Sequence, residues 1–350
     1  MNTISVNASQ RYDVLVGKGI LSNLGTYAVN ICGKCKAVMI SDTNVFPIYG
    51  NIVESSLLQA GIETVHYVFS AGEESKTINT YTDILNFLAK TQITRTDMVI
   101  ALGGGVVGDI AGFAAATFLR GISYIQVPTS LLAMVDSSVG GKTAIDLPVG
   151  KNLVGAFKQP RLVLCDVNVL STLPESYFID GCAEIIKYCM LYDANLFAYL
   201  VNSGLNFDRE MVISKCITFK AAVVHEDEFD TGARQKLNLG HTIGHGIELR
   251  SNFKISHGCA VAVGMMIVTK AAVKRGLCAE TVFRSLQDIL LKFSLPCATA
   301  FTARELYQSA LSDKKRSGGS VNLIIPKEIG NCEIVPTQVS ELESFIEAGL

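Results

Sequence analysis

The sequence predicts an α/β N-terminal nucleotide-binding domain with a variant Rossmann-like parallel sheet, followed by a mainly α-helical metal-binding domain. Three observations predict this. Short β-rich runs alternate with helix-like segments in the first half, helix-like segments dominate after about Leu173, and a glycine-rich loop joins a predicted strand to a predicted helix. Alternation of strands and helices favours a parallel sheet with helices on its faces. Pro174 punctuates the change, so we predict domains at 1–173 and 174–350.

The predicted elements follow from hydrophobic runs and their spacing. The predicted strands of the first half are residues 36–41, 64–69, 98–102, 124–127 and 162–165. The predicted helices are residues 78–90 and 109–119 in the first half, and 174–200, 208–225, 240–249, 257–275 and 281–293 in the second. A late apolar run at 321–325 predicts a lone strand.

Composition excludes several classes of protein. The formal net charge of −2 over 350 residues leaves no electrostatic footprint for nucleic acid or anionic lipid. The N-terminus lacks the pattern of a secretory signal, and polar residues or glycines interrupt the apolar stretches, so we predict no membrane span. The ten cysteines are scattered, and the single C-x-x-C, Cys32 and Cys35, has no second pair, which favours free thiols over zinc. These features fit a reducing cytoplasm.

Gly103, Gly105 and Gly108 form a G-x-G-x-x-G pattern between a predicted strand and a predicted helix. In that context glycines let the backbone approach a pyrophosphate at a helix N-terminus. The alternative is a tight turn that binds nothing. No strand ends in an acidic residue about 20 residues later, as the usual fingerprint requires. Asp42 instead ends an earlier strand, so we expect a variant of the fold.

A second glycine site, residues 139–143, resembles the end of an ATP-binding P-loop. The complete pattern needs a glycine where this chain has Asp136, which argues against an ATPase. Lys142 on this loop remains able to meet a phosphate as a point charge.

Four of the five histidines lie between His225 and His257. His241 and His245 are four residues apart and share a helix face, but Thr242 stands where a metalloprotease has its glutamate. A catalytic metal needs a third ligand, for which His257 and Glu184 are candidates. Core or capping histidines are the alternative.

Several cationic side chains stand beside glycine, apolar or small residues and outside solvated charge runs. They are Arg120, Lys142, Lys151, Lys187, Lys220 and Arg234. Such a set suits a substrate that carries phosphate and carboxylate groups. For Lys187 the alternative is an ordinary ion pair with Glu184, three residues earlier on the same helix face.

Six segments taken together resemble the dehydroquinate synthase family over about residues 10–325. The segments are residues 103–113, 126–143, 150–157, 183–187, 237–245 and 257–265. The resemblance implies an NAD-binding domain, a helical domain, an active site in the cleft and a homodimer. It also implies a divalent zinc or cobalt ion held by Glu184, His241 and His257.

The resemblance further implies two sets of binding residues. NAD would contact Asp42, Glu73, Lys76, Gly104, Gly105, Val106, Asp109, Thr129, Ser130 and Asp136, with Lys142 and Lys151 between nucleotide and substrate. The substrate would be surrounded by Arg120, Lys142, Asn152, Lys187, Lys220, Arg234, Asn238 and His245, with one of Lys314 or Lys315.

The implied substrate is 3-deoxy-D-arabino-heptulosonate 7-phosphate. Transient oxidation of a ring carbon by NAD would acidify the adjacent proton, so that phosphate leaves by elimination. The hydride then returns, the ring opens and an intramolecular aldol step closes a carbocycle, which proximity favours. Ser130, Cys259 and Asp230 stand where the family usually has threonine, glutamate and glutamate, which affects substrate geometry more than reaction class. The rival hypotheses are a sister sugar-phosphate cyclase, a metal-dependent polyol dehydrogenase and a non-catalytic NAD- or metal-binding protein.

Overall fold

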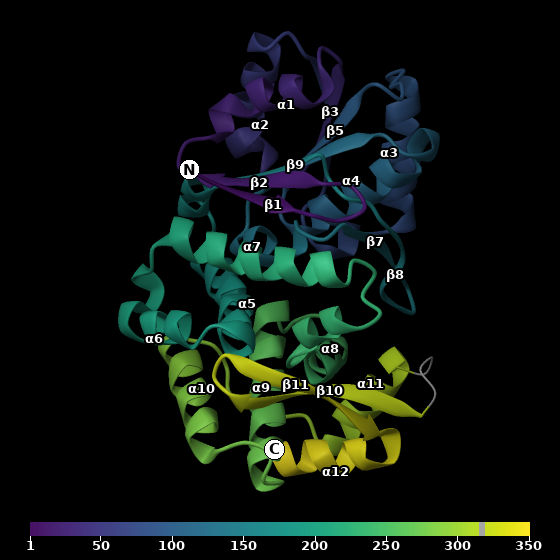
Figure 1. The fold of residues 1–350 in the computed structure, drawn as a ribbon. Coiled ribbons are helices and arrows are strands. Elements are labelled where there is room, and N and C mark those ends of the chain that lie inside the picture. Colours follow the sequence, from purple (N-terminus) through teal and green to yellow (C-terminus); the bar gives the residue numbers. More distant parts are fainter. Residues whose placement is uncertain (315–318) are drawn as a thin grey trace. The chain divides into compact units, whose positions relative to one another are not determined.

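The computed structural model describes residues 1–314 and 319–350, with side chains for 1–311 and 319–350 (Figure 1). The described chain divides into two compact units. Unit 1 is Met1–Pro174 with Arg209–Phe229, and unit 2 is Glu175–Asp208 with Asp230–Leu350.

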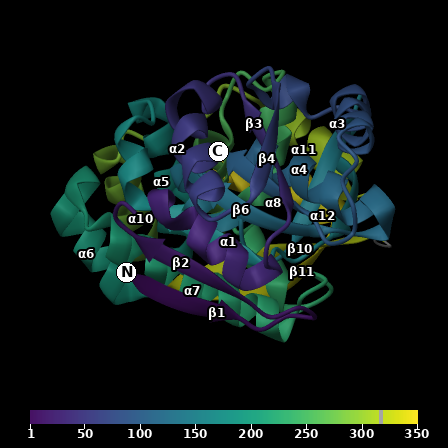
Figure 2. The same cartoon turned by 90° about the horizontal axis from the view of Figure 1, so that it is seen from above.

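A seven-stranded sheet forms the centre of unit 1, in the order β1-β2-β9-β6-β5-β3-β4. Its strands are β1 (Asn2–Val6), β2 (Tyr12–Gly17), β3 (Lys36–Asp42), β4 (Glu63–Phe69), β5 (Met98–Gly103), β6 (Ser123–Pro128) and β9 (Leu162–Asp166). Only β1 runs antiparallel to its neighbour, along the edge seen in Figure 2. Every residue of β5 is buried, which explains its continuous apolar run.

The remaining elements of unit 1 cover or extend this sheet. The α-helices are α1 (Leu24–Cys32), α2 (Phe46–Gln59), α3 (Ile78–Lys90), α4 (Gly105–Thr117) and α7 (Arg209–Glu226). Short 3-10 helices are η1 (Leu21–Asn23), η2 (Glu73–Ser75), η3 (Phe118–Arg120) and η5 (Val167–Ser171), and η4 (Ala133–Ser137) is a π-helix. A separate hairpin joins β7 (Lys142–Leu147) to β8 (Gly150–Phe157).

Unit 2 is built around α9 (His257–Lys274). The other helices are α5 (Glu175–Tyr192), α6 (Ala194–Ser203), η6 (Gly204–Asn206), η7 (Ala233–Asn238), α8 (His241–Arg250), α10 (Glu280–Lys292), α11 (Ala303–Lys314) and α12 (Val339–Gly349). Helices α5, α8, α10 and α12 pack against α9. Although α9 has the length and apolarity of a membrane span, 72% of it is buried inside the protein, as in a core helix.

The five strands predicted for the first half are confirmed. The segment predicted as one helix over 174–200 is two helices, because Asp193 leaves the helical conformation and caps α6 by accepting the N–H of Leu196 (2.9 Å). The late strand is not alone: β10 (Ser320–Glu328) pairs antiparallel with β11 (Asn331–Gln338). Helix α7 packs against β1, β2 and η4 in unit 1, although it follows the predicted domain boundary.

Candidate active site

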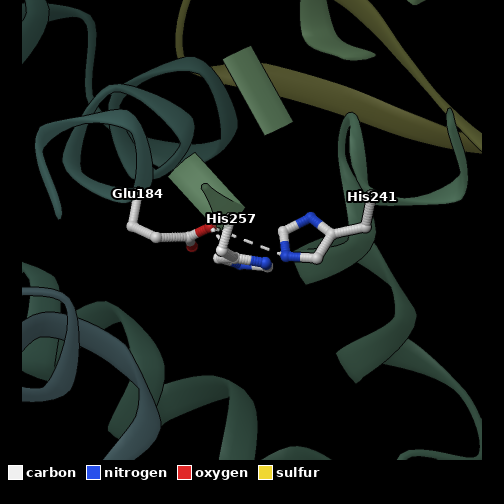
Figure 3. A group of neighbouring side chains, drawn as sticks. All are labelled: Glu184, His241 and His257. Carbon is white, nitrogen blue, oxygen red and sulfur yellow. Dashed lines mark ion pairs between the residues drawn. The ribbon is translucent and has the colours of Figure 1, made fainter. Parts of the chain in front are cut away.

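Three predicted metal ligands converge in unit 2 from three different helices (Figure 3). Glu184 comes from the middle of α5, and His241 and His257 are the first residues of α8 and α9. Glu184 Oε1 lies 3.5 Å from His241 Nε2 and 3.4 Å from His257 Nε2. One donor atom from each side chain lies within 4.8 Å of the others.

Glycines at two helix crossings bring these side chains together. A Cβ on Gly258, next to His257, would lie 2.0 Å from the carbonyl oxygen of Asp180, one turn before Glu184 on α5. A Cβ on Gly264 would lie 2.0 Å from the carbonyl oxygen of Gly240, the residue before His241. Because no side chain fits at either point, α9 approaches both neighbours at backbone distance. The convergence therefore depends on packing that the separate motifs do not display.

The hydrogen bonds of both histidines favour metal binding through Nε2. His241 Nδ1 lies 3.1 Å from the backbone oxygen of Leu239, and His257 Nδ1 lies 3.3 Å from Glu248 Oε2. In the neutral form that binds a metal, each ring donates its Nδ1–H to these acceptors and carries on Nε2 a lone pair that faces Glu184. Two imidazole nitrogens and one carboxylate are a donor set that suits zinc or cobalt and leaves positions open for substrate. The residues present thus fit a catalytic divalent metal.

The two histidines have very different pKa values in the metal-free chain. Burial, followed by the charge of Lys187, lowers the pKa of His241 to about 3 against the opposing effect of Glu184. Burial also acts to lower the pKa of His257, but hydrogen bonds and charges from Glu184 and Glu248 outweigh it and raise this pKa to about 10. At neutral pH His257 is therefore positively charged and His241 neutral, so the two rings together carry about one positive charge.

Further residues predicted to meet substrate lie around these three. Lys187, with 1% of its side chain exposed, forms an ion pair with fully buried Glu184, which was the alternative considered for it. The exposed ring of His245 lies 5.5 Å from that of His241 and 6.3 Å from that of His257, between ring centroids. Buried Arg234 and half-buried Asn238 lie on η7, which leads into α8. In unit 2, Lys187 and His245 therefore lie beside the candidate metal ligands, and Arg234 and Asn238 lie on the segment that leads into α8.

The glycine-rich loop of unit 1 has the predicted strand-to-helix form. It joins β5 to α4, and Gly104 begins the helix without a side-chain cap. A Cβ on Gly108 would lie 2.7 Å from Gln126 Oε1 on β6, which shows how tightly helix and sheet pack here. Thr129 donates its backbone N–H to the oxygen of Gly103 (2.9 Å), so the start of the next loop is tied to this one. The uncapped amides of α4 suit a phosphate group.

Lys76 connects four of the other predicted residues of unit 1. Its Nζ donates to Asp109 Oδ2 (2.6 Å) and to Asn152 Oδ1, and lies 4.0 Å from Glu73, which also pairs with Lys151 (3.4 Å). Burial acts to lower the pKa of Lys76, but the charges of Asp109 and Glu73 outweigh it and raise the pKa. Lys76 is therefore a fixed positive charge at the first turns of α4.

The other predicted residues of unit 1 lie on several different elements, and Ser130 lies beside the glycine-rich loop, with its Oγ 3.4 Å from where a Cβ on Gly104 would be. Lys220 on α7 donates to the backbone oxygen (2.6 Å) and Oδ1 (2.9 Å) of Asp136 on η4. Asp42 accepts the backbone N–H groups of Asn44 (2.8 Å) and Val45 (2.9 Å) after β3. The remaining residues of the set are half-buried Val106 and Ser130 and exposed Arg120 and Lys142. Lys314 and Lys315 lie outside the residues whose side chains the structure describes.

Two residues that the sequence reasoning missed support these networks. Glu248, 4% exposed, contacts His257, and its position seven residues after His241 on one helix face was a readable signal. Asp146 accepts the backbone N–H of Asn152 (2.7 Å) and donates its own N–H to the oxygen of Lys76 (2.7 Å). No spacing pattern marks Asp146, because it acts across the β7–β8 hairpin.

The chain matches known proteins of the family that its sequence motifs resemble. Family models described as 3-dehydroquinate synthase N-terminal and C-terminal match residues 66–180 and 181–316. A curated 3-dehydroquinate synthase of Clostridium acetobutylicum is 43% identical over 353 residues, covering 99% of each chain. One from Streptococcus thermophilus is 40% identical and covers 98% of this chain and 99% of its own length.

Solved structures agree with this match. A 2-deoxy-scyllo-inosose synthase complexed with carbaglucose-6-phosphate, NAD+ and Co2+ superposes with a TM-score of 0.89 at 26% identity, covering 100% of both chains. A 2-epi-5-epi-valiolone synthase from Streptomyces hygroscopicus, with NAD+ and Zn2+ bound, has a TM-score of 0.89 at 25% identity and covers 99% of this chain and 98% of its own. An iron-containing alcohol dehydrogenase shares the fold, with a TM-score of 0.70 at 15% identity. The predicted fold class and the resemblance are thus confirmed, and the chain belongs to the 3-dehydroquinate synthase family.

Proposed function

We propose that this chain converts 3-deoxy-D-arabino-heptulosonate 7-phosphate into 3-dehydroquinate and phosphate, using NAD and a divalent zinc or cobalt ion. The observation that carries the proposal is the convergence of Glu184, His241 and His257 in a chain 43% identical to a curated 3-dehydroquinate synthase. Solved relatives that contain NAD+ with Co2+ or Zn2+ support the cofactor assignment.

The metal would be held by Glu184 Oε1 and by the Nε2 atoms of His241 and His257. When bound, the metal supplies a Lewis acid for a substrate hydroxyl, and NAD takes and returns one hydride. Substrate and products are at the same oxidation level, so NAD is not consumed. The chain's own contribution is fixed charge and orientation, which stabilise developing negative charge without reorganisation.

Residues of unit 2 supply that charge beside the proposed metal. Lys187 is buried against Glu184 and presents its ammonium group at the centre. His245 has an exposed ring within 6.3 Å of both ligand rings and is positioned to hold or move a proton. We assign Arg234 and Asn238 to the anionic groups of the substrate, since a guanidinium binds carboxylate or phosphate bidentately. Arg120, Lys142, Asn152 and Lys220 of unit 1 stay predicted substrate residues.

The nucleotide would bind the glycine-rich loop of unit 1. The uncapped start of α4 offers backbone amides to its phosphates, and Lys76 fixes Asp109 close by. We also propose a cytoplasmic homodimer. None of the ten cysteines, all of which lie in the described residues, forms a disulfide bond, which suits a reducing compartment. Sedimentation equilibrium tests the dimer.

One assay tests the function against its rivals. The chain is supplied with cobalt, catalytic NAD and the heptulosonate phosphate, and both phosphate and NADH are followed. Phosphate release without accumulating NADH is the expected result. Accumulating NADH would instead indicate a polyol dehydrogenase. Release only from glucose 6-phosphate, or from a heptulose 7-phosphate that lacks the carboxylate, would indicate a sister cyclase.

A further inference from the structure

We propose that Glu248 is a positioning residue of the metal centre: it holds the Nδ1–H of His257 so that Nε2 of that ring faces the metal. The inference rests on the proposed metal centre and extends it to a residue outside the three ligands. Glu248 would not touch the metal or the substrate but would act through His257.

Geometry places Glu248 on the far side of the His257 ring from Glu184. Glu248 Oε2 lies 3.3 Å from Nδ1, whereas Glu184 Oε1 lies 3.4 Å from Nε2. The imidazole is therefore bracketed by two carboxylates, one at each nitrogen. A neutral imidazole donates from one nitrogen only, so a carboxylate that accepts at Nδ1 leaves the lone pair at Nε2.

Helix α8 carries both ends of this arrangement. His241 begins the helix and Glu248 follows seven residues later, so both side chains project from the same face toward the first turn of α9. The side chain of Glu248 is 6% exposed, whereas that of His257 is 31% exposed. A nearly buried carboxylate is stabilised by a hydrogen-bond donor, and the His257 ring supplies one. The same helix thus provides one ligand and the orientation of another.

His241 provides an internal comparison. Its Nδ1 lies 3.1 Å from the backbone oxygen of Leu239, an acceptor that no side-chain substitution removes. The two ligand histidines therefore have the same arrangement, with Nε2 toward Glu184 and Nδ1 toward an oxygen. Only the acceptor of His257 is a side chain, so only this one is open to mutation.

A competing role for Glu248 follows from the same geometry. Donor atoms of His245, Glu248 and His257 also lie within 4.8 Å of one another, so Glu248 would itself be a ligand if the ion sat there. His245 of this second set is exposed, whereas in the first set Glu184 is fully buried and the His241 side chain is 12% exposed. Outer carboxylates on ligand histidines typically change metal affinity by about 10–100-fold when removed. Affinity and stoichiometry together separate the two roles.

The experiment compares native protein with Glu248→Ala and Glu248→Gln, using Co2+ as the probe. The readouts are the Co2+ dissociation constant by chelator competition, the number of ions bound, the visible absorption spectrum and the exchangeable Nδ1–H proton signals shifted by cobalt. Asp180→Asn is the matched control. Asp180 accepts the backbone N–H of Cys259 (3.1 Å) in the same turn of α9, but among the described residues no hydrogen bond or ion pair joins it to the histidine rings.

Native protein is expected to bind one Co2+ and show two shifted Nδ1–H signals. Glu248→Ala is expected to raise the dissociation constant about 10–100-fold and to lose or move the His257 signal while the His241 signal stays. Glu248→Gln should lie between, since its amide oxygen still accepts, and Asp180→Asn should stay within about 3-fold of native. Circular dichroism of the metal-free variants checks folding.

Unchanged affinity and spectrum in folded Glu248→Ala would overturn the inference. So would a second Co2+ per chain that this variant loses, because Glu248 would then be a ligand. If Glu248→Ala does not fold, the test uses native protein alone. The absence of a His257 Nδ1–H signal from cobalt-loaded native protein would then overturn the inference. If native protein binds no Co2+, the proposed metal centre itself is wrong. This outcome differs from failure of the Glu248 inference, in which native protein still binds Co2+.

Discussion

The candidate metal centre of unit 2 and the glycine-rich loop of unit 1 are assembled in opposite ways. The loop is contiguous: β5, the glycines and the first turn of α4 follow one another in the chain. The metal centre takes one side chain from each of α5, α8 and α9, and close helix crossings bring them together. A local motif depends on its own backbone conformation, whereas a converging site depends on packing. The two should therefore fail differently when mutated.

The largest difference is expected from removing a ligand. His257→Ala should reduce phosphate release by about 10³-fold or more, because a Lewis acid supplies several kcal/mol of transition-state stabilisation. NAD binding, measured by fluorescence or calorimetry, should change little because the loop lies in the other unit. His66→Ala, which removes an exposed histidine paired with Glu54, is the control. Full activity in His257→Ala would remove it from the ligand set.

Breaking the buried ion pair of the metal centre should have the next largest effect. Lys187→Met leaves Glu184 buried and should lower the free energy of unfolding of metal-free protein by about 3 kcal/mol. Bound metal should reduce that loss, since it neutralises the same carboxylate. Lys327→Met, which breaks a partly exposed pair with Glu333, should cost less than about 1 kcal/mol. Equal losses in urea denaturation for both variants would show that the Lys187 pair is not special.

A glycine substitution tests whether packing builds the metal centre. Gly264→Ala places a Cβ 2.0 Å from the oxygen of Gly240, so α8 and α9 must move apart, at a cost of about 1–3 kcal/mol. Gly246→Ala is matched, because its Cβ would meet the Ser309 Cβ at 3.2 Å and no backbone atom as closely. Only Gly264→Ala should also weaken Co2+ binding. If it unfolds less readily than native protein and keeps its cobalt affinity, the crossing does not position the ligands.

The smallest expected effect is the release of protons when the metal binds. His257, with its pKa raised to about 10, is protonated at neutral pH in metal-free protein, whereas His241, with its pKa lowered to about 3, is neutral. Metals bind neutral imidazole, so binding at about pH 7.5 should release about one proton and tighten about tenfold per pH unit, flattening as the pH passes the His257 pKa. Calorimetry in buffers of different ionisation enthalpy measures the number. Release of no proton or of two protons would contradict the assignment of one protonated and one neutral histidine in the metal-free protein.

The same contrast explains what the sequence could predict. Apolar runs located the buried strands such as β3 and β5, and histidine clustering with helical spacing pointed to a metal. The pairing of β10 with β11 was missed because the alternation of polar and apolar residues at 331–334 is short and Pro336 interrupts the strand pattern that follows. Glu184 and His257 remained alternatives from spacing alone, because three helices must pack before they meet. Lys76 contacts Asp109 and Asn152, which are distant in the sequence, and no local pattern encodes such contacts. Glu248 was overlooked, although its position seven residues after His241 places both on one helix face.

Anomalous diffraction at the cobalt edge, from crystals of the cobalt-loaded protein, tests the central claim most directly. We predict one peak bonded to Glu184 and to the Nε2 atoms of His241 and His257, at about 2.0–2.2 Å, with Glu248 on Nδ1 of His257. A peak among His245, Glu248 and His257, or no peak near Glu184, would contradict it.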